Sequence, residues 1–358
     1  MSAHRLKILV LADSRSFHIE RLARELVRQG CRVVTASLER GRLCHYKLKR
    51  RGPVKAWHYP LSAPEVKSII RKYRPDVINP HYACGYGFST ALAVGKGGPP
   101  VVLDLWGSDI LIVPRKSFFH RAITRTALRR ADLVLGDSQY LLSAAEALAR
   151  PARKSVVRWG IERQYLEFHR SDYELRRPLR IIVPRPHEEV YNNGFILRAL
   201  APLIVKEDVE ITFPDFGSQA GEFRAEGESL VGGKVKFYPR MSRYEFMRFM
   251  AGFDVYLSAA RSDSSPVSLI EAMGLGLIPI AADIPGISEW LTKASGYRFR
   301  QDSADGLRAV IEGLLSEKDP HERMRRGNFE RVRREAVFEH NVAERIRLMH
   351  GLAEGADG

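Results

Sequence analysis

The sequence has few cysteines and no long apolar run. Its 358 residues include three cysteines, Cys31, Cys44 and Cys84, and their odd number and irregular spacing favour neither a disulfide framework nor a zinc site. No apolar run approaches the roughly 20 residues that span a bilayer, and the first residues do not resemble a signal peptide. We therefore expect a cytoplasmic protein that is neither secreted nor membrane-spanning, and no metal.

Glycine-rich phosphate-binding loops are also missing. The first predicted strand-to-helix loop contains Asp13, Ser14, Arg15 and Ser16, followed by His18, where a dinucleotide-binding fold would carry its glycine fingerprint. This argues against an NAD-dependent enzyme.

Acidic residues are scarce in the first half of the chain. Residues 1–160 hold 29 Lys and Arg against 11 Asp and Glu, whereas the rest holds 28 against 31, and the net charge is +15. Such asymmetry indicates a phosphate-rich partner, either nucleic acid or an anionic membrane, although solvated arginines on helix faces would give the same charge.

Short β-branched runs alternate with helical patterns along the whole chain. The first helical pattern, 17–30, carries apolar residues on one face and stops at Gly30. Alternation of this kind predicts an α/β fold with parallel, doubly wound sheets. The predicted strands are 6–12, 32–37, 76–80, 100–106, 132–136 and 155–157, and then 179–184, 208–213, 234–238, 254–259 and 277–282.

This pattern restarts after a charged, aromatic stretch at 158–178, which we interpret as a linker. We therefore expect two Rossmann-like domains, residues 1–160 and 161–337. The tail is helical in pattern, with breaks expected near Gly327 and Phe338.

Two acids, Asp263 and Glu271, stand eight residues apart, and the chain after the first of them reads "SSPVSLIEAMGLG", residues 264–276. Pro266 suits the first helical position with Ser265 as the cap, so that free N–H groups at the helix start would hold an anion. Glu271 would be costly if buried without donors, which sugar or ribose hydroxyls would supply. An ordinary capped helix with a solvated glutamate is the alternative.

The longer stretch 258–291, which continues this segment with "LIPIAADIPGISEWL", resembles the most recognisable segment of family-4 glycosyltransferases. The resemblance implies the GT-B fold, with two domains facing an interdomain cleft, a final helix at about 338–353 that packs back on the first domain, and a retaining mechanism. It also implies that Asp263 contacts the transferred sugar, Ser264 and Ser265 bind sugar or phosphates, and Glu271 binds ribose. The first acid is Asp here, whereas Glu is commoner in the family.

The family also uses an Arg and a Lys to neutralise the donor pyrophosphate. Arg185 occupies the first of these positions, but Asn193-Gly194 stands where Lys-Gly is usual. Because an amide brings no charge, another cation is expected to substitute, and Arg240 and Arg261 are the candidates.

In the first domain, "PVVLDLWGSDIL" resembles a loop that usually reads His-Gly-x-Asp. Trp106 replaces the histidine and Asp109 keeps the carboxylate. Tryptophan cannot accept a proton, so we expect it to shape the cleft or stack on a sugar. His81, in "NPHYACGYG", is either structural or part of the same site, and Arg15 and His18 are acceptor-side candidates.

Basic residues concentrate at 39–57 and 114–130. The second segment, as a helix, places Arg121 and Arg125 on one side and apolar residues on others, which suits an anionic membrane surface. Nucleic-acid binding would require a reading module, and none is visible.

These observations predict a glycosyltransferase that moves a sugar from a UDP- or GDP-sugar, without a cofactor, to a glycan or lipid-linked acceptor. Synthesis of cell-surface polysaccharide or glycoconjugate, at the inner face of the membrane, is the expected setting. The alternatives are a GT-B relative with epimerase or hydrolase chemistry and a non-catalytic nucleotide-sugar-binding protein.

Overall fold

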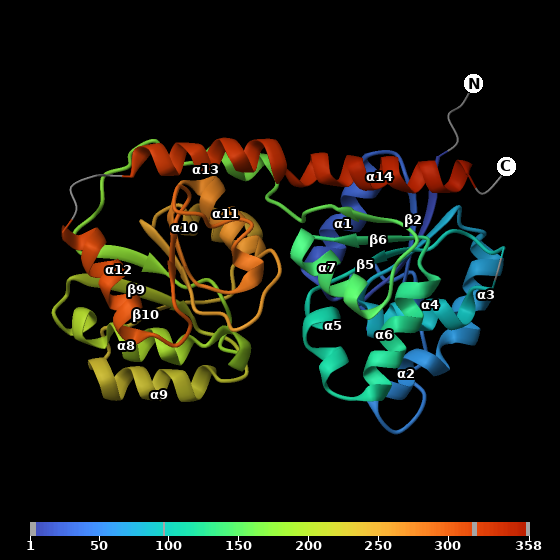
Figure 1. Ribbon diagram of the computed structural model, residues 1–358, viewed down its shortest axis with the longest axis horizontal. Coiled ribbons are helices and arrows are strands. Elements are labelled where there is room, and N and C mark those ends of the chain that lie inside the picture. Colours follow the sequence, from blue (N-terminus) through green and yellow to red (C-terminus); the bar gives the residue numbers. More distant parts are fainter. Residues whose placement is uncertain (1–4, 96, 317–320, 356–358) are drawn as a thin grey trace. The chain divides into compact units, whose positions relative to one another are not determined.

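A computed structural model describes residues 5–95, 97–316 and 321–355 of the chain (Figure 1). The chain forms two compact units. The first comprises the residues up to Arg158 together with those from Glu339 onward, and the second runs from Trp159 to Phe338. The first unit is therefore built from both ends of the sequence.

All strands of the first unit are parallel. The pairing order is β3 (Tyr46–Lys47), β2 (Arg32–Ser37), β1 (Lys7–Leu11) and β4 (Val77–Pro80), and separately β5 (Val102–Asp104), β6 (Leu133–Gly136) and β7 (Lys154–Val156). Parallel bridges from Ile78 to Val101 and from His81 to Asp104 join the two groups edge to edge. The strand order therefore reverses next to β1, between β1 and β4, which is the place where doubly wound folds bind ligands.

Helices cover both faces of this sheet, so its central strands β1, β4, β5 and β6 are almost entirely buried, whereas the outer strands β2, β3 and β7 are partly exposed. Figure 1 shows α14 along one side of β5 and β6, and α4 and α6 on the other side. The helices are α1 (Phe17–Arg28), α2 (Lys55–Leu61), α3 (Ala63–Tyr73), α4 (Phe88–Ala93), α5 (Ser108–Leu111), α6 (Phe118–Arg130), α7 (Gln139–Leu148) and α14 (Phe338–Glu354), with short turns η1 (Tyr82–Gly87) and η2 (Val113–Arg115).

The second unit has one six-stranded parallel sheet. Its order is β10 (Lys236–Tyr238), β9 (Val209–Pro214), β8 (Leu179–Ile182), β11 (Val255–Ser258), β12 (Ile278–Ala282) and β13 (Tyr297–Phe299). The helices are α8 (Asn193–Val205), α9 (Ala220–Val231), α10 (Arg243–Met250), α11 (Val267–Leu275), α12 (Ala304–Ser316) and α13 (Glu322–Glu335), with short turns η3 (Arg163–Phe168), η4 (Glu189–Tyr191) and η5 (Pro285–Ile287). One core lies under α8, α9 and α12 and the other under α10, α11 and α13.

The predicted α/β architecture is confirmed, with each predicted strand present within a few residues. The predicted break at Gly327 is wrong, because α13 runs through it. Buried side chains on either side anchor the helix: Arg325 donates to the carbonyls of Gly276 and Tyr173, and Asn328 donates to that of Ser295. These bonds outweigh the roughly 1 kcal/mol that glycine costs in a helix.

No helix in the described part of the chain is both long enough and apolar enough to cross a bilayer.

Candidate functional site

The second unit gathers predicted donor-site residues at the carboxyl end of its sheet. Arg185 follows β8 and Asp263 follows β11, and these two strands are neighbours in the sheet. The strand order reverses there as well, so the two side chains meet at the edge where α/β folds bind ligands.

Arg185 and Asp263 form an ion pair. The Arg185 Nη2 atom lies 2.7 Å from Asp263 Oδ2, and Nη1 lies 3.4 Å from Ser268 Oγ. Both side chains are largely buried, and the guanidinium lies 4.1 Å from the ring centroid of Tyr191. Burial opposes the charged form, but the Asp263 carboxylate outweighs it and raises the pKa of Arg185. The guanidinium is therefore held as a fixed cation with donors to spare for a phosphate.

The loop after Asp263 is fixed by a bond that the sequence did not suggest. Helix α11 begins at Val267 with Pro266 in the capping position, so the expected cap by Ser265 is wrong. The Ser265 hydroxyl instead accepts a hydrogen bond of 2.9 Å from the indole of Trp290, and Ser264 is also buried. Pro266 itself offers no side-chain cap to the first N–H groups of α11.

Glycine at 286 allows this loop to pack where it does. A Cβ atom at Gly286 would lie 2.1 Å from the carbonyl oxygen of Asp263 and 2.7 Å from that of Ser264. Because such distances are far inside van der Waals contact, any other residue at 286 would displace the loop.

Glu271 is buried and paired with a residue that sequence reasoning missed. It accepts a hydrogen bond of 2.5 Å from Arg243 Nη2, which also lies 3.2 Å from Glu162. The expected cost of burying Glu271 is therefore offset by an arginine of the protein itself. A local signal existed, because Ser242 and Glu245 form a capping box that marks the helix start at Arg243.

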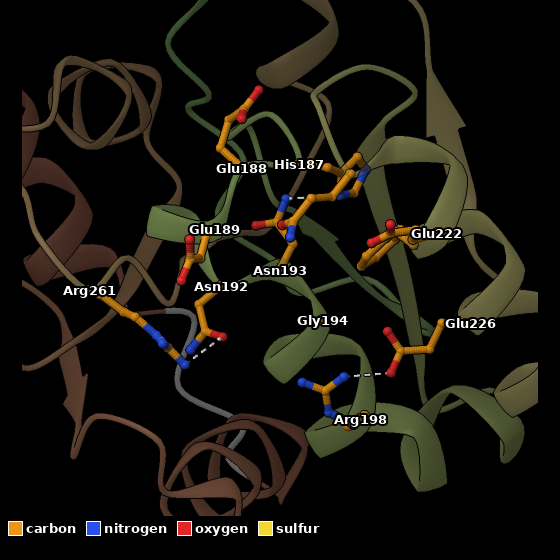
Figure 2. Close-up of a pocket in the computed structure, with 12 residues that line it drawn as sticks. His187, Glu188, Glu189, Asn192, Asn193, Gly194, Arg198, Glu222, Glu226 and Arg261 are labelled. Carbon is orange, nitrogen blue, oxygen red and sulfur yellow. Dashed lines mark hydrogen bonds and ion pairs between the residues drawn. The ribbon is translucent and has the colours of Figure 1, made fainter.

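Asn193 serves the backbone and does not replace a cation. Its side-chain amide donates to the carbonyls of Arg185 at 2.9 Å and Pro186 at 3.3 Å, and it lies 3.2 Å from the His187 ring (Figure 2). Asn193 thereby fixes the loop that carries Arg185. A Cβ atom at Gly194 would meet only the flexible ends of Arg198 and Glu226.

The two candidate substitute cations have other partners. Arg240 lies over the ring of Phe216 at 4.2 Å, and Arg261 lies 3.4 Å from Asn192 and 3.7 Å from Asp302. Neither joins the Arg185–Asp263 pair by a hydrogen bond or ion pair in the described residues. Arg261 does line a pocket of about 210 Å³, together with Asn193 and four glutamates, at 188, 189, 222 and 226 (Figure 2).

The first unit centres on a buried polar chain at the carboxyl ends of β4 and β5. The Trp106 indole N–H donates to Nδ1 of His81 at 3.2 Å, and the other ring nitrogen of His81 lies 3.1 Å from Asn79 Oδ1. Asn79 in turn donates to Asp104 at 2.7 Å, and Asp104 pairs with Arg345 of α14. Burial lowers the pKa of His81 to about 4, although Asp104 opposes the shift, so the ring is neutral at pH 7.

Asp109 fastens the neighbouring loop. Its carboxylate accepts from the backbone N–H of Ala83 at 2.7 Å and of Trp106 at 3.0 Å. Burial raises the pKa of Asp109 to about 6 despite these bonds. Asp109 therefore fixes Trp106 from the backbone side while His81 fixes its indole.

These residues border an aromatic pocket of about 510 Å³ within the first unit. It is lined by Ala12, Asp13, Ser16, Ile19, Tyr59, His81, Tyr82, Cys84, Tyr86, Phe88, Trp106, Val113, His120 and Ile123. His18 lies edge-on to Trp106, with ring centroids 6.0 Å apart. Arg15 is exposed and forms a two-point ion pair with Asp13. The structure thus brings Trp106, His81, His18 and Asp109 together, whereas Arg15 lies exposed in the loop between β1 and α1.

Two family models match this chain, one within each unit. Residues 7–138 match the family model described as glycosyl transferase 4-like, and residues 202–331 match that of glycosyl transferases group 1. The Bacillus subtilis protein TuaC, named as a teichuronic acid biosynthesis glycosyltransferase, is 23% identical over 67% of this chain and 61% of its own length. An uncharacterized glycosyltransferase of Methanocaldococcus jannaschii is 22% identical over 71% of this chain and 69% of its own. The chain thus spans less than two thirds of TuaC.

Solved structures show the same fold at low identity. Sucrose-phosphate synthase of Thermosynechococcus elongatus superposes with a TM-score of 0.82 at 14% identity, covering 98% of this chain and all of that one. HepE of Anabaena, solved in complex with UDP, superposes with a TM-score of 0.79 at 15% identity, covering 97% and 100% of the two chains.

Proposed function

Because this chain belongs to the family-4-like glycosyltransferases of the GT-B fold, we propose that it transfers a sugar from a nucleoside diphosphate donor to a glycan or lipid-linked acceptor with retention of anomeric configuration. We place this reaction in the synthesis of cell-surface polysaccharide or glycoconjugate. The observation that carries the proposal is the paired arrangement of Arg185 with Asp263 and of Arg243 with Glu271 in the part of the unit that holds α11, whose capping position is taken by a proline.

In this proposal, each group binds or positions one part of the donor. Arg185 and the first N–H groups of α11 bind the pyrophosphate, where charge develops as the sugar leaves. Glu271, already oriented by Arg243, accepts hydrogen bonds from the ribose hydroxyls. Asp263 holds Arg185 in place and lies on the side of the transferred sugar. A UDP-sugar is the first choice of donor, since HepE was solved with UDP and with UDP-glucose, and a GDP-sugar is the second.

The roles of the first unit follow from its pocket. Trp106 cannot take a proton, and both ring nitrogens of His81 are engaged within the protein. We therefore assign these two residues, with Asp109, to shaping the acceptor side, and His18 to its edge. We assign no residue of the described chain as a base. In the retaining reaction that we propose, the leaving nucleoside diphosphate takes the proton of the acceptor hydroxyl through its phosphate oxygen.

Donor binding is tested by calorimetry with UDP-, GDP-, ADP- and TDP-sugars. Arg185→Ala and Glu271→Ala should each weaken binding at least tenfold, because each removes a charge-assisted contact. Matched controls are Arg326→Ala and Glu312→Ala, which alter exposed positions of α13 and α12 in the same unit. If none of the four donors binds the unaltered chain, or if the controls lose as much, the donor assignment is wrong. Product analysis then separates transfer from epimerisation and hydrolysis.

We further propose that the first unit contacts an anionic membrane. Phe118 and Phe119 at the start of α6 are 79% and 76% exposed, and Trp57 of α2 is 55% exposed. The segment 114–130 has six Lys and Arg and no Asp or Glu. Of these cations Arg130 pairs with Asp132 at 3.0 Å, outside the segment. Exposed aromatics beside a segment rich in cations suit a lipid surface with negative charge.

Vesicle sedimentation tests this contact. Phe118→Ser/Phe119→Ser should abolish binding to phosphatidylglycerol vesicles, and Arg121→Glu/Arg125→Glu should weaken it and remove its salt dependence. Val205→Ser/Leu230→Ser removes exposed apolar side chains from the second unit and should change nothing. Equal binding to neutral phosphatidylcholine vesicles would contradict the proposal.

A further inference from the structure

Arg243 is shared by two glutamates that come from distant parts of the second unit. Its Nη2 atom lies 2.5 Å from Oε1 of Glu271, on α11, and 3.2 Å from Oε2 of Glu162, which precedes η3. The side chains of Glu162 and Glu271 are 12% and 5% exposed. Burial opposes the charged form of Arg243, but the two carboxylates outweigh it and raise its pKa. One guanidinium therefore serves two carboxylates in a largely buried cluster.

Glu271 is bound at only one of its two carboxylate oxygens. Among the described residues, Oε1 accepts the hydrogen bond from Arg243 and Oε2 has no hydrogen-bond partner. Arginine frequently binds a carboxylate at two points, through two parallel N–H···O bonds. An unpaired acceptor in so buried a side chain is costly unless a ligand supplies the donor. The arrangement thus leaves Glu271 one oxygen for the hydroxyl groups of a ligand.

Glu162 extends from a backbone segment that is fixed on its entering side. The N–H of the preceding residue, Ile161, donates to the carbonyl of Ala336 at 2.9 Å, and its carbonyl accepts from the N–H of Phe338 at 2.8 Å. A Cβ atom at Gly160 would lie 2.1 Å from the Ala336 carbonyl oxygen, so glycine is required for this close approach. The Glu162 carboxylate is therefore an anchored partner that draws the guanidinium toward itself.

We propose that Glu162 is a positioning residue of the donor site, which holds Arg243 aside so that the guanidinium does not bind both oxygens of Glu271. Oε2 of Glu271 is thereby kept for the ribose hydroxyls of the donor. Without the charge of Glu162, Arg243 turns fully to Glu271 and forms the two-point pair, which occupies both oxygens. The inference rests on the proposed function and adds to it a residue that selects ribonucleotide over deoxyribonucleotide donors.

Calorimetry with UDP and with its deoxyribose analogue dUDP measures this role, because the two ligands differ in one ribose hydroxyl. The unaltered chain should bind UDP about tenfold more tightly than dUDP, as expected for one hydrogen bond to a charged group. Glu162→Gln keeps the shape and removes the charge, and it should reduce this preference to about twofold or less. Glu162→Asp keeps the charge and should retain most of the preference. Glu167→Gln, at an exposed position of η3, is the matched control and should retain all of it.

A double variant tests the mechanism itself. Lysine is a point charge and does not form the two-point pair, so Glu162→Gln/Arg243→Lys should regain the preference for UDP that Glu162→Gln loses. Because the preference is a ratio of two affinities measured on the same preparation, a partly unfolded variant does not change it. A loss of stability alone therefore does not imitate the expected result.

The outcomes separate this inference from the proposed function. Loss of the preference in Glu162→Gln and its return in the double variant support the positioning role. An unchanged preference in Glu162→Gln, an equal weakening of UDP and dUDP binding, or a double variant that does not regain the preference overturns it, while binding of UDP continues to support the donor site. Equal binding of UDP and dUDP by the unaltered chain would overturn the ribose contact of Glu271, and absence of UDP binding would overturn the choice of donor.

Discussion

Replacing Arg345 by methionine should selectively destabilise the first unit. The Arg345 and Asp104 side chains are 3% and 2% exposed and form an ion pair at the carboxyl end of β5. In Arg345→Met, Asp104 keeps the Asn79 amide but loses its cation, and removal of one partner of a buried pair costs about 3–5 kcal/mol. Hydrogen exchange at amides of β4 and β5 should therefore accelerate by roughly two to three and a half orders of magnitude.

The pH dependence of this loss distinguishes an unpaired charge from lost packing. In the native chain burial opposes ionisation, but Arg345 outweighs it and lowers the pKa of Asp104. Without Arg345, burial becomes the dominant influence and raises the pKa of Asp104 above its ordinary value. The free energy of unfolding of the variant should then increase as pH falls. The loss should therefore be smaller at pH 4.5 than at pH 8.

Two further variants complete this test. Arg345→Met/Asp104→Asn removes both charges and should recover at least half of the loss. Arg347→Met breaks an exposed pair with Glu344 on the same helix and should leave exchange unchanged. A loss below about 1 kcal/mol at pH 8, or one that is the same at both pH values, would refute the reasoning.

His81 and Asp109 should give the first unit opposite pH dependences that cancel. As pH falls from 6.5 to about 4, His81 is protonated in the unfolded chain before it is protonated in the native one, so the free energy of unfolding decreases. As pH falls from about 6 to 3.8, Asp109 is protonated in the native chain first, so the free energy of unfolding increases. Each single variant leaves the other group's pH dependence unbalanced. Urea titrations should therefore show that Asp109→Asn loses about 3 kcal/mol of stability on acidification, whereas His81→Gln gains about 3 kcal/mol. The same pH dependence of stability in both variants would contradict this. Gly286→Ala should weaken donor binding at least tenfold by displacing Asp263, whereas Gly313→Ala, in an open position of α12, should not; unchanged calorimetric binding by Gly286→Ala would contradict the packing argument.

Local sequence patterns were enough to predict the fold class. Each buried strand is a short apolar run, and the helices carry apolar residues at helical spacing. They also placed Arg185, Asp263 and Trp106 at strand ends, where the structure has them. Parallel sheets put the ends of neighbouring strands at one edge, so the sequence alone brings such residues near each other.

Pairings across the fold were not predictable. Arg243 meets Glu271 only because α10 and α11 pack side by side on one face of the sheet. Asn193 was interpreted as a missing lysine, yet its amide holds the backbone of the Arg185 loop. Residue type and spacing do not encode which distant partner a polar side chain finds.

The Arg345–Asp104 pair has a consequence for the order of folding during synthesis. The two residues are 241 positions apart, with the whole second unit between them. At about 5–20 residues per second, a ribosome needs roughly 10 to 50 s to make that stretch. Through this interval the nascent first unit holds Asp104 without its cation, so the buried polar chain at the carboxyl end of β5 is incomplete. We expect the first unit to be the last to reach its final stability, although it is the first to be translated.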